Sequence, residues 1–206
     1  MTIKIGGILP VKRASILALS LGIVLSGCGT TPENNTPAPA ATTTSSALAP
    51  ASEQKAMSAE EVNRFKEYAP NLKGGPFITE AEIVNQNEAV ITYADFATLK
   101  KAKPETGMTE ADAKNYWESG DAINKALMEE PIRLLKEFPE LQKVRVTLNH
   151  GKKYTTEIDR ATIEDYLKVN LAETKADKDK WRNEIVNKFF TKEERAKYIE
   201  KFVKAD

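Results

Sequence analysis

The sequence has very few of the residues from which most catalytic and metal sites are built. It contains one cysteine and one histidine in 206 residues. With no second thiol, an intramolecular disulfide is excluded, and so is a zinc site built from several cysteine and histidine ligands. We therefore expect no metal and no cofactor, although a calcium site made of carboxylates stays open.

The sequence also lacks an excess of charge of either sign. Lys and Arg together number 30, as do Asp and Glu. Three of the basic residues (Lys4, Lys12 and Arg13) and none of the acidic ones precede Cys28, so the chain from Cys28 onward carries a net charge of −3. Binding to phosphates requires clustered Lys and Arg, and we therefore expect no nucleic-acid partner.

No apolar run is long enough for a stable membrane-spanning helix. The longest, Ile16 to Leu25, has about ten residues and as a helix would extend about 15 Å, half of a bilayer core. Basic residues precede this run, and the small residues Ser26 and Gly27 follow it. This order is typical of a cleaved secretory signal.

The only cysteine directly follows this signal, in the sequence Leu25-Ser26-Gly27-Cys28. The segment 1–28 resembles the lipobox region of bacterial lipoprotein precursors. The resemblance implies that the Cys28 thiol is alkylated with diacylglycerol, that residues 1–27 are removed, and that the new amino terminus is acylated, as with palmitate. Two or three acyl chains hold a protein on a membrane almost permanently. The membrane is thus the first expected partner, bound through Cys28.

The residue after the lipobox bears on the destination. Gly29 stands where an aspartate would retain lipoproteins of the family in the inner membrane of enteric-type bacteria. The resemblance therefore implies an exported, lipid-anchored protein, in the outer membrane if the cell has two membranes and on the cell surface if it has one.

The chain divides into three parts by composition. Residues 1–27 form the signal. Residues 28–56 begin with the lipidated cysteine and continue as a Thr, Pro, Ala and Ser-rich stretch that lacks the apolar surface to fold, so we expect a disordered tether. Residues 57–206 are predicted to form one globular domain.

Helix signals dominate that domain. Ser58 with Glu61 predicts a capping box, and Val62, Phe65 and Ala69 share one face of the helix that follows. A further helix is predicted from Thr109 with Asp112, with Tyr116, Gly120, Ile123 and Leu127 on one face. Pro131 either kinks this helix or lies in the first turn of a new one, PIRLLKEF (131–138). Helices are also predicted after Asp159, around Trp181 to Phe189, and from Thr191 with Glu194. The polar residues DKDK (177–180) are interpreted as a solvated linker and the start of the next helix.

The segment 79–101 carries two competing signals. Thr79 with Glu82 is typical of a capping box, and the apolar residues that follow lie near helical spacing. The segment also contains a run with high strand propensity, Val90 to Tyr93. We predict a helix here.

A β-hairpin is predicted over residues 141–159. Val144, Val146 and Leu148 alternate with polar residues, and alternation continues through Ile158. A three-residue loop at 149–151, with Gly151 left-handed, would pair Val146 with Tyr154. The expected fold is therefore helix-rich α+β, with several amphipathic helices packed on one β-hairpin.

Few residues in this domain suggest chemistry. His150 is expected to be a solvated residue at the hairpin tip, without the partners that a catalytic triad needs. Carboxylate pairs occur in charged helical stretches, where helix capping and solvation explain them. These pairs are Glu60 with Glu61, Glu129 with Glu130, and Glu193 with Glu194. No catalytic residue is assigned.

Trp117 is the one candidate interface residue. If its neighbour Tyr116 faces the core, Trp117 is turned away from it and is expected to be partly exposed, as an interface anchor would be. The sequence thus predicts a membrane-anchored, non-enzymatic binding module whose partner is an envelope protein or, second to that, a glycan. The alternative is a carboxylate-dependent hydrolase acting on cell-wall or other polymers.

Overall fold

The computed structural model describes residues 56–206. The predicted signal, the lipobox residues Leu25, Ser26, Gly27 and Cys28, and almost all of the predicted tether therefore lie outside the described residues.

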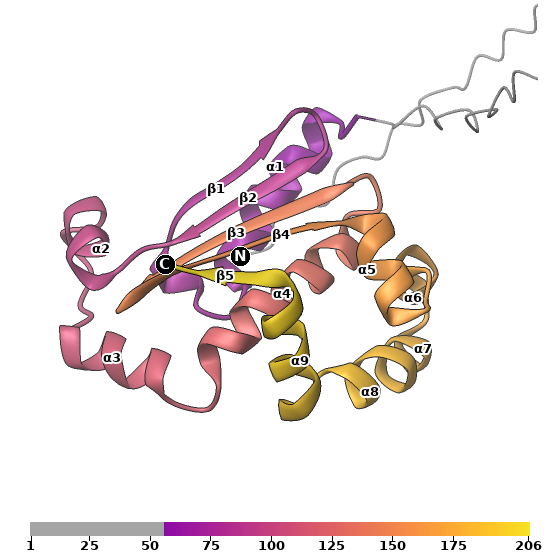
Figure 1. The fold of residues 1–206 in the computed structure, drawn as a ribbon. Helices are drawn as coiled ribbons and strands as arrows, with labels where there is room; N and C mark the ends of the chain where they lie inside the picture. The colour runs from indigo at the N-terminus through magenta and orange to yellow at the C-terminus, as the bar shows by residue number, and fades with distance from the viewer. Residues whose placement is uncertain (1–55) are drawn as a thin grey trace, which may run out of the picture. The chain divides into compact units, whose positions relative to one another are not determined.

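The described chain forms a five-stranded mixed sheet with strand order β1-β2-β3-β4-β5 (Figure 1). The central pair, β2 and β3, is parallel, and the other neighbouring pairs are antiparallel. The strands are β1 (Ile78–Val84), β2 (Glu88–Tyr93), β3 (Lys143–His150), β4 (Lys152–Asp159) and β5 (Val203–Ala205).

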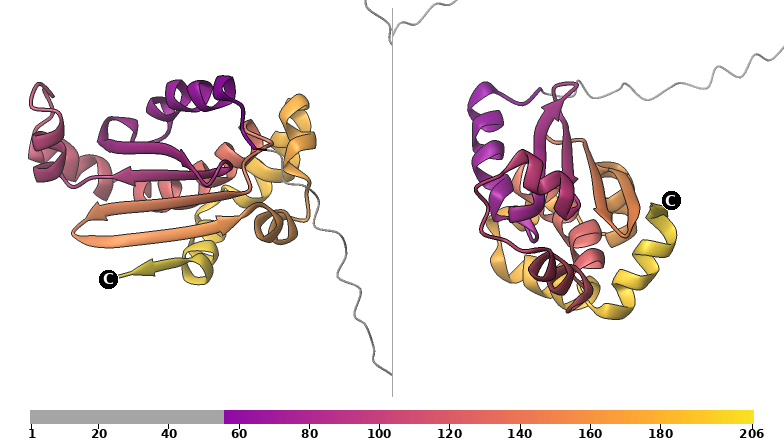
Figure 2. Two further views of the ribbon diagram at one scale, coloured as in Figure 1. Left: turned by 90° about the horizontal axis from the view of Figure 1, so that it is seen from above. Right: turned by 90° about the vertical axis from the view of Figure 1, so that its left-hand side faces the viewer.

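Helices occupy most of the remaining residues within 56–206 and gather on one face of the sheet (Figure 2). The longer ones are α1 (Ala59–Tyr68), α2 (Phe96–Ala102), α3 (Glu110–Glu118), α4 (Ala122–Glu137), α5 (Arg160–Leu167), α6 (Leu171–Ala176) and α9 (Lys192–Phe202). Shorter turns are η1 (Ala69–Asn71), η2 (Gly75–Phe77), α7 (Lys178–Lys180), the π-helical η3 (Trp181–Val186) and α8 (Asn187–Phe189). The expected helix-rich α+β class is confirmed.

The sheet is larger than the single hairpin predicted, because the expected helix at 79–101 is wrong. Residues 78–84 and 88–93 pair as an antiparallel hairpin, and only Phe96–Ala102 is helical. Ala89, Ile91 and Tyr93 alternate into the core, so the strand propensity of Val90 to Tyr93 was the better guide.

The 141–159 hairpin is confirmed, with a different register. Val146 lies opposite Thr156 rather than Tyr154, and His150 lies opposite Lys152, so the loop is tighter than the three residues expected. The shift is two residues, which keeps every side chain on its predicted face. Gly151 has the predicted left-handed conformation, with φ of +67°.

One face of the sheet packs on the helices and the other carries charge. Val144, Val146 and Leu148 of β3 are buried on the helix side. Arg145 lies opposite Glu157 on the other side, where its Nε donates to Glu157 at 2.8 Å. A polar face is possible here because β3 and β4 pair antiparallel, and antiparallel strands tolerate solvent on one side.

The stretch 177–180, predicted as a linker and helix start, does begin a helical segment, and α6 before it was not predicted. Asn170 caps α6, and the Asp177 carboxylate accepts from the backbone N–H groups of Asp179 and Lys180 at the start of α7. The predicted single helix through Gly120 is also interrupted. Gly120 and Asp121 both have positive φ and separate α3 from α4. Pro131 lies inside the continuous helix α4.

Candidate functional site

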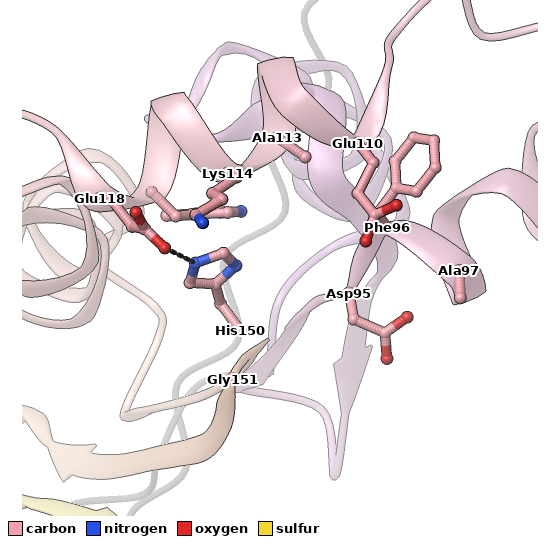
Figure 3. Close-up of a pocket in the computed structure, with 10 residues that line it drawn as sticks. Asp95, Phe96, Ala97, Glu110, Ala113, Lys114, Glu118, His150 and Gly151 are labelled. Atoms are coloured by element: carbon pink, nitrogen blue, oxygen red, sulfur yellow. Dashed lines mark ion pairs between the residues drawn. The ribbon is translucent and has the colours of Figure 1, made fainter.

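A pocket of about 410 Å³ lies at the carboxyl ends of β2 and β3 (Figure 3). Because these two strands are parallel, the residues that follow them meet at one edge of the sheet. Asp95 and Phe96 come after β2, and His150 ends β3. Helix α3 closes the remaining side.

The start of α2 is fixed by its first residue. The Asp95 carboxylate accepts from the backbone N–H of Thr98 at 2.7 Å and from the Thr98 hydroxyl at 3.2 Å. This N-cap satisfies an otherwise unpaired donor of the helix. One carboxylate of the pocket is thereby committed to a structural role.

The start of α3 is fixed by the predicted capping box. The Thr109 hydroxyl accepts from the N–H of Asp112 at 3.2 Å, and the Asp112 carboxylate accepts from the N–H of Thr109 at 3.0 Å. The Thr109 hydroxyl also donates to the Asp112 carboxylate at 2.6 Å, and this bond, together with the one from the Thr109 N–H, holds the pKa of Asp112 below its ordinary value. The box sets where the helix begins, and so which of its residues face the pocket.

One stripe of α3 supplies the charged wall of the pocket. Glu110, Lys114 and Glu118 follow one another at intervals of four, which places them on the same helix face. All three are exposed at the pocket rim. The two glutamates are eight residues apart, or about 12 Å along the helix axis.

Trp117 forms part of the floor, and the expectation that it is exposed is wrong. It is only 3% exposed and packs on Phe77 and Tyr93, with ring centroids 4.9 and 5.6 Å away. Its neighbour Tyr116, expected in the core, is instead 37% exposed. The face of α3 that turns inward, with Ala113 and Trp117, is therefore rotated by about 100° from the one predicted.

His150 is more enclosed than a solvated loop residue. Its side chain is 23% exposed, and its Nε2 lies 3.8 Å from Oε1 of Glu118 (Figure 3). This brings together an imidazole and a carboxylate that are 32 positions apart in the sequence. The residues lining the pocket include no serine, threonine, cysteine or tyrosine, so the pair has no hydroxyl or thiol nucleophile beside it.

The pair Glu129 and Glu130 is not solvated as predicted, since each residue is 3% exposed. Both belong to a buried ion cluster of α4. Arg195 of α9 donates to Glu129 at 2.9 Å and to Asp121 at 2.6 Å. The amine of Lys73 also contacts Glu129, and Arg133 lies 3.4 Å from Glu130. These carboxylates hold helices together and are closed to a substrate.

The other two carboxylate pairs agree with the surface and capping interpretation. The backbone N–H of Glu61 donates to the Ser58 hydroxyl, and the carboxylate of Glu61 pairs with Arg64 at 2.7 Å. In the same way, the backbone N–H of Glu194 donates to the Thr191 hydroxyl at the start of α9, and the carboxylate of Glu194 pairs with Lys197 at 2.6 Å. Neither pair lines the pocket.

Within residues 56–206, no group of three or more His, Asp or Glu side chains has the geometry to hold a metal ion. The same residues include no helix long and apolar enough to cross a bilayer. Comparison of the chain with protein-family models, with curated proteins and with solved structures gave no match.

Sequence reasoning missed most of this pocket. Asp95, Glu110, Lys114 and Glu118 were not singled out, and His150 was expected to be solvated. The i, i+4, i+8 charge stripe of α3 was visible in the sequence, but such stripes are common on solvated helices. The pairing of β2 with β3, together with the packing of Trp117 of α3 on Tyr93 of β2, brings the stripe beside His150.

Proposed function

We propose that the chain is an exported bacterial lipoprotein, held on the membrane by lipid on Cys28, whose folded domain is a non-enzymatic binding module of the cell envelope. The address rests on Leu25, Ser26 and Gly27 before Cys28, behind a basic segment and a short apolar run. Gly29 favours the outer membrane in a cell with two membranes.

The pocket supports binding over catalysis. Its one imidazole lies beside a carboxylate but beside no nucleophile among the lining residues, and Asp95 is occupied as a helix cap. Glu110 and Glu118 are about 12 Å apart along α3, whereas paired carboxylates of glycosidases are about 5 to 9.5 Å apart. Charged groups around an apolar floor suit the recognition of a partner.

A carboxylate-dependent hydrolase is the second candidate, favoured by one observation. Asp95, Glu110 and Glu118 converge on one pocket from two different elements. If the protein cleaves a cell-wall polymer, Glu110→Gln and Glu118→Gln each abolish product release. A binding module releases no product in either form.

The address is tested by the intact mass of the membrane-extracted protein beside a Cys28→Ala variant. We expect the mass of diacylglycerol and an acyl chain on the wild type only, with the variant lost from the membrane fraction, because several buried acyl chains are needed for lasting anchorage. Crosslinking in cells then identifies what the domain contacts. An unmodified, freely released wild type contradicts the address.

A further inference from the structure

The pocket at the ends of β2 and β3 has unbalanced charge. Three carboxylates line it, against Lys114 and a histidine. Among the described residues, Glu118 has only His150 as an ionic neighbour, at 3.8 Å, and no ion pair engages Glu110. Carboxylates at an otherwise apolar depression favour a cation.

The walls of the pocket suit the uncharged part of such a ligand. Phe96 is half-buried, Ala113 and Trp117 are buried beneath the charged rim, and Ala97 is small and exposed. An alkyl stem can lie along such surface while its charged end stays near the carboxylates. A cavity of about 410 Å³ accommodates one long side chain and the adjoining backbone.

The pocket lies far from the point where the described chain begins. The N–H of Met57 donates to the carbonyl of Gln86, in the turn that precedes β2, at 3.0 Å. The pocket is at the other end of the same strands, and Figure 1 shows α2 and α3 at the opposite end from the start of α1. Eight residues of β3 cover about 25 Å. Met57, near the start of the described chain, therefore lies at the opposite end of these strands from the pocket.

We propose that this pocket binds a lysine side chain of an extended peptide, with the ammonium group between Glu110 and Glu118 and the stem over Phe96. The inference rests on the proposed binding function and specifies its ligand. Lys114 lies between the two glutamates on the same stripe of α3, and its positive charge repels the bound cation and weakens its binding.

The test uses the full chain in detergent micelles, labelled with ¹⁵N. Three blocked tripeptides are titrated against it: Ala-Lys-Ala, Ala-norleucine-Ala and Ala-Glu-Ala. Only the lysine peptide is expected to shift the backbone signals of Lys114 and Gly151. Because the carboxylates are exposed, binding weakens when the salt concentration is raised.

The variants separate a cation site from other kinds of site. Glu110→Gln and Glu118→Gln each weaken lysine-peptide binding about twofold to fivefold, the range for an exposed ion pair. Lys114→Gln strengthens it about twofold, since it removes a repulsive charge. Glu200→Gln, an equal loss of charge at an exposed site on α9, leaves binding unchanged.

Several results overturn the inference. They are equal binding of the norleucine peptide, preferential binding of the glutamate peptide with loss in Lys114→Gln, and no shift at the pocket with any peptide. The proposed function fails separately, through an unmodified Cys28 or the absence of any crosslinked partner. A partner crosslinked away from the pocket overturns this inference and leaves the binding function standing.

Discussion

At the scale of single residues, two adjacent glycines allow the chain to pass from α1 to β1. Gly74 has φ of +77°, and a Cβ there would lie 2.6 Å from the ring of Trp117. Gly75 has an ordinary φ, but a Cβ on it would lie 2.0 Å from the carbonyl oxygen of Pro70. Each position excludes a side chain for a different reason, the first by conformation and ring packing and the second by backbone contact.

Gly75→Ala is expected to destabilise the fold by roughly 1–3 kcal/mol, since backbone has to move to accept the methyl group. Gly107→Ala is the matched control, because nothing lies within 4 Å of a Cβ there. Urea unfolding followed by circular dichroism measures both. Equal urea midpoints for Gly75→Ala and the wild type would show that the backbone of this turn moves to accept the methyl group without a measurable loss of stability.

The exchange of Tyr116 and Trp117 is also a residue-scale effect. Both are large and amphipathic, so the sequence does not say which of two neighbours turns inward. Gly74 leaves room for the Trp117 ring, and Phe77 and Tyr93 complete the contacts of that ring. Tertiary packing therefore decides which of the two residues is buried. The helical period only places neighbouring side chains on different faces, so that both are not buried together.

At the scale of elements, helix starts were the best-predicted feature. Ser58, Thr109 and Thr191 each accept a hydrogen bond from the N–H three residues later, as their sequence spacing indicates. Caps are local, so they can be recognised without knowledge of the rest of the fold. The same pattern at Thr79 and Glu82 failed because sheet pairing outweighs a single local signal.

Thr109→Ala is expected to cost about 1 kcal/mol of folding stability, because it removes the acceptor for the Asp112 N–H and one half of the capping box. Thr109→Ser keeps the hydroxyl and should match the wild type. Thermal unfolding of the three proteins measures the difference. If alanine and serine behave alike, the box adds nothing to the packing of α3.

At the scale of the whole molecule, the buried ion cluster joins parts of the chain that are far apart in sequence. Arg195 of α9 reaches Glu129 and Asp121, and Lys73 reaches Glu129 from the turn before β1. Loss of one partner from a buried pair leaves a charge without compensation, at a cost of about 3–5 kcal/mol. The cluster therefore fixes α4 and α9 relative to one another.

Glu130 gives this cluster a pH dependence. Burial raises the pKa of Glu130 above its ordinary value of 4.5, although Arg133 and Lys73 act in the opposite direction. The folded state thus binds this proton more tightly than the unfolded chain. Its contribution to stability is complete below pH 4.5 and is lost as the pH rises through the folded-state pKa.

Glu130→Gln is therefore expected to gain stability relative to the wild type as the pH rises from 4 to 7, because the amide stays neutral. The measurement is the free energy of unfolding in urea across that range, with Glu200→Gln as the exposed control. A difference between variant and wild type that stays constant with pH would show that burial does not govern this carboxyl.

The sequence by itself determined the features that depend on neighbours along the chain. These are the helix-rich α+β class, most helix starts, the alternation of Val144, Val146 and Leu148, and the left-handed Gly151. The lipobox expectation for Cys28 is of the same local kind and awaits its mass measurement. Each rests on spacing within a few residues, where geometry is set by the backbone.

Tertiary structure alone decided which residues far apart in the sequence come into contact. It paired β2 with β3 in parallel, which brings Asp95 to the same edge as His150, and it buried Glu129 and Glu130 beneath Arg195. Contacts between residues far apart in sequence depend on strand order and helix packing, and no local pattern encodes them. The pocket is a product of that assembly.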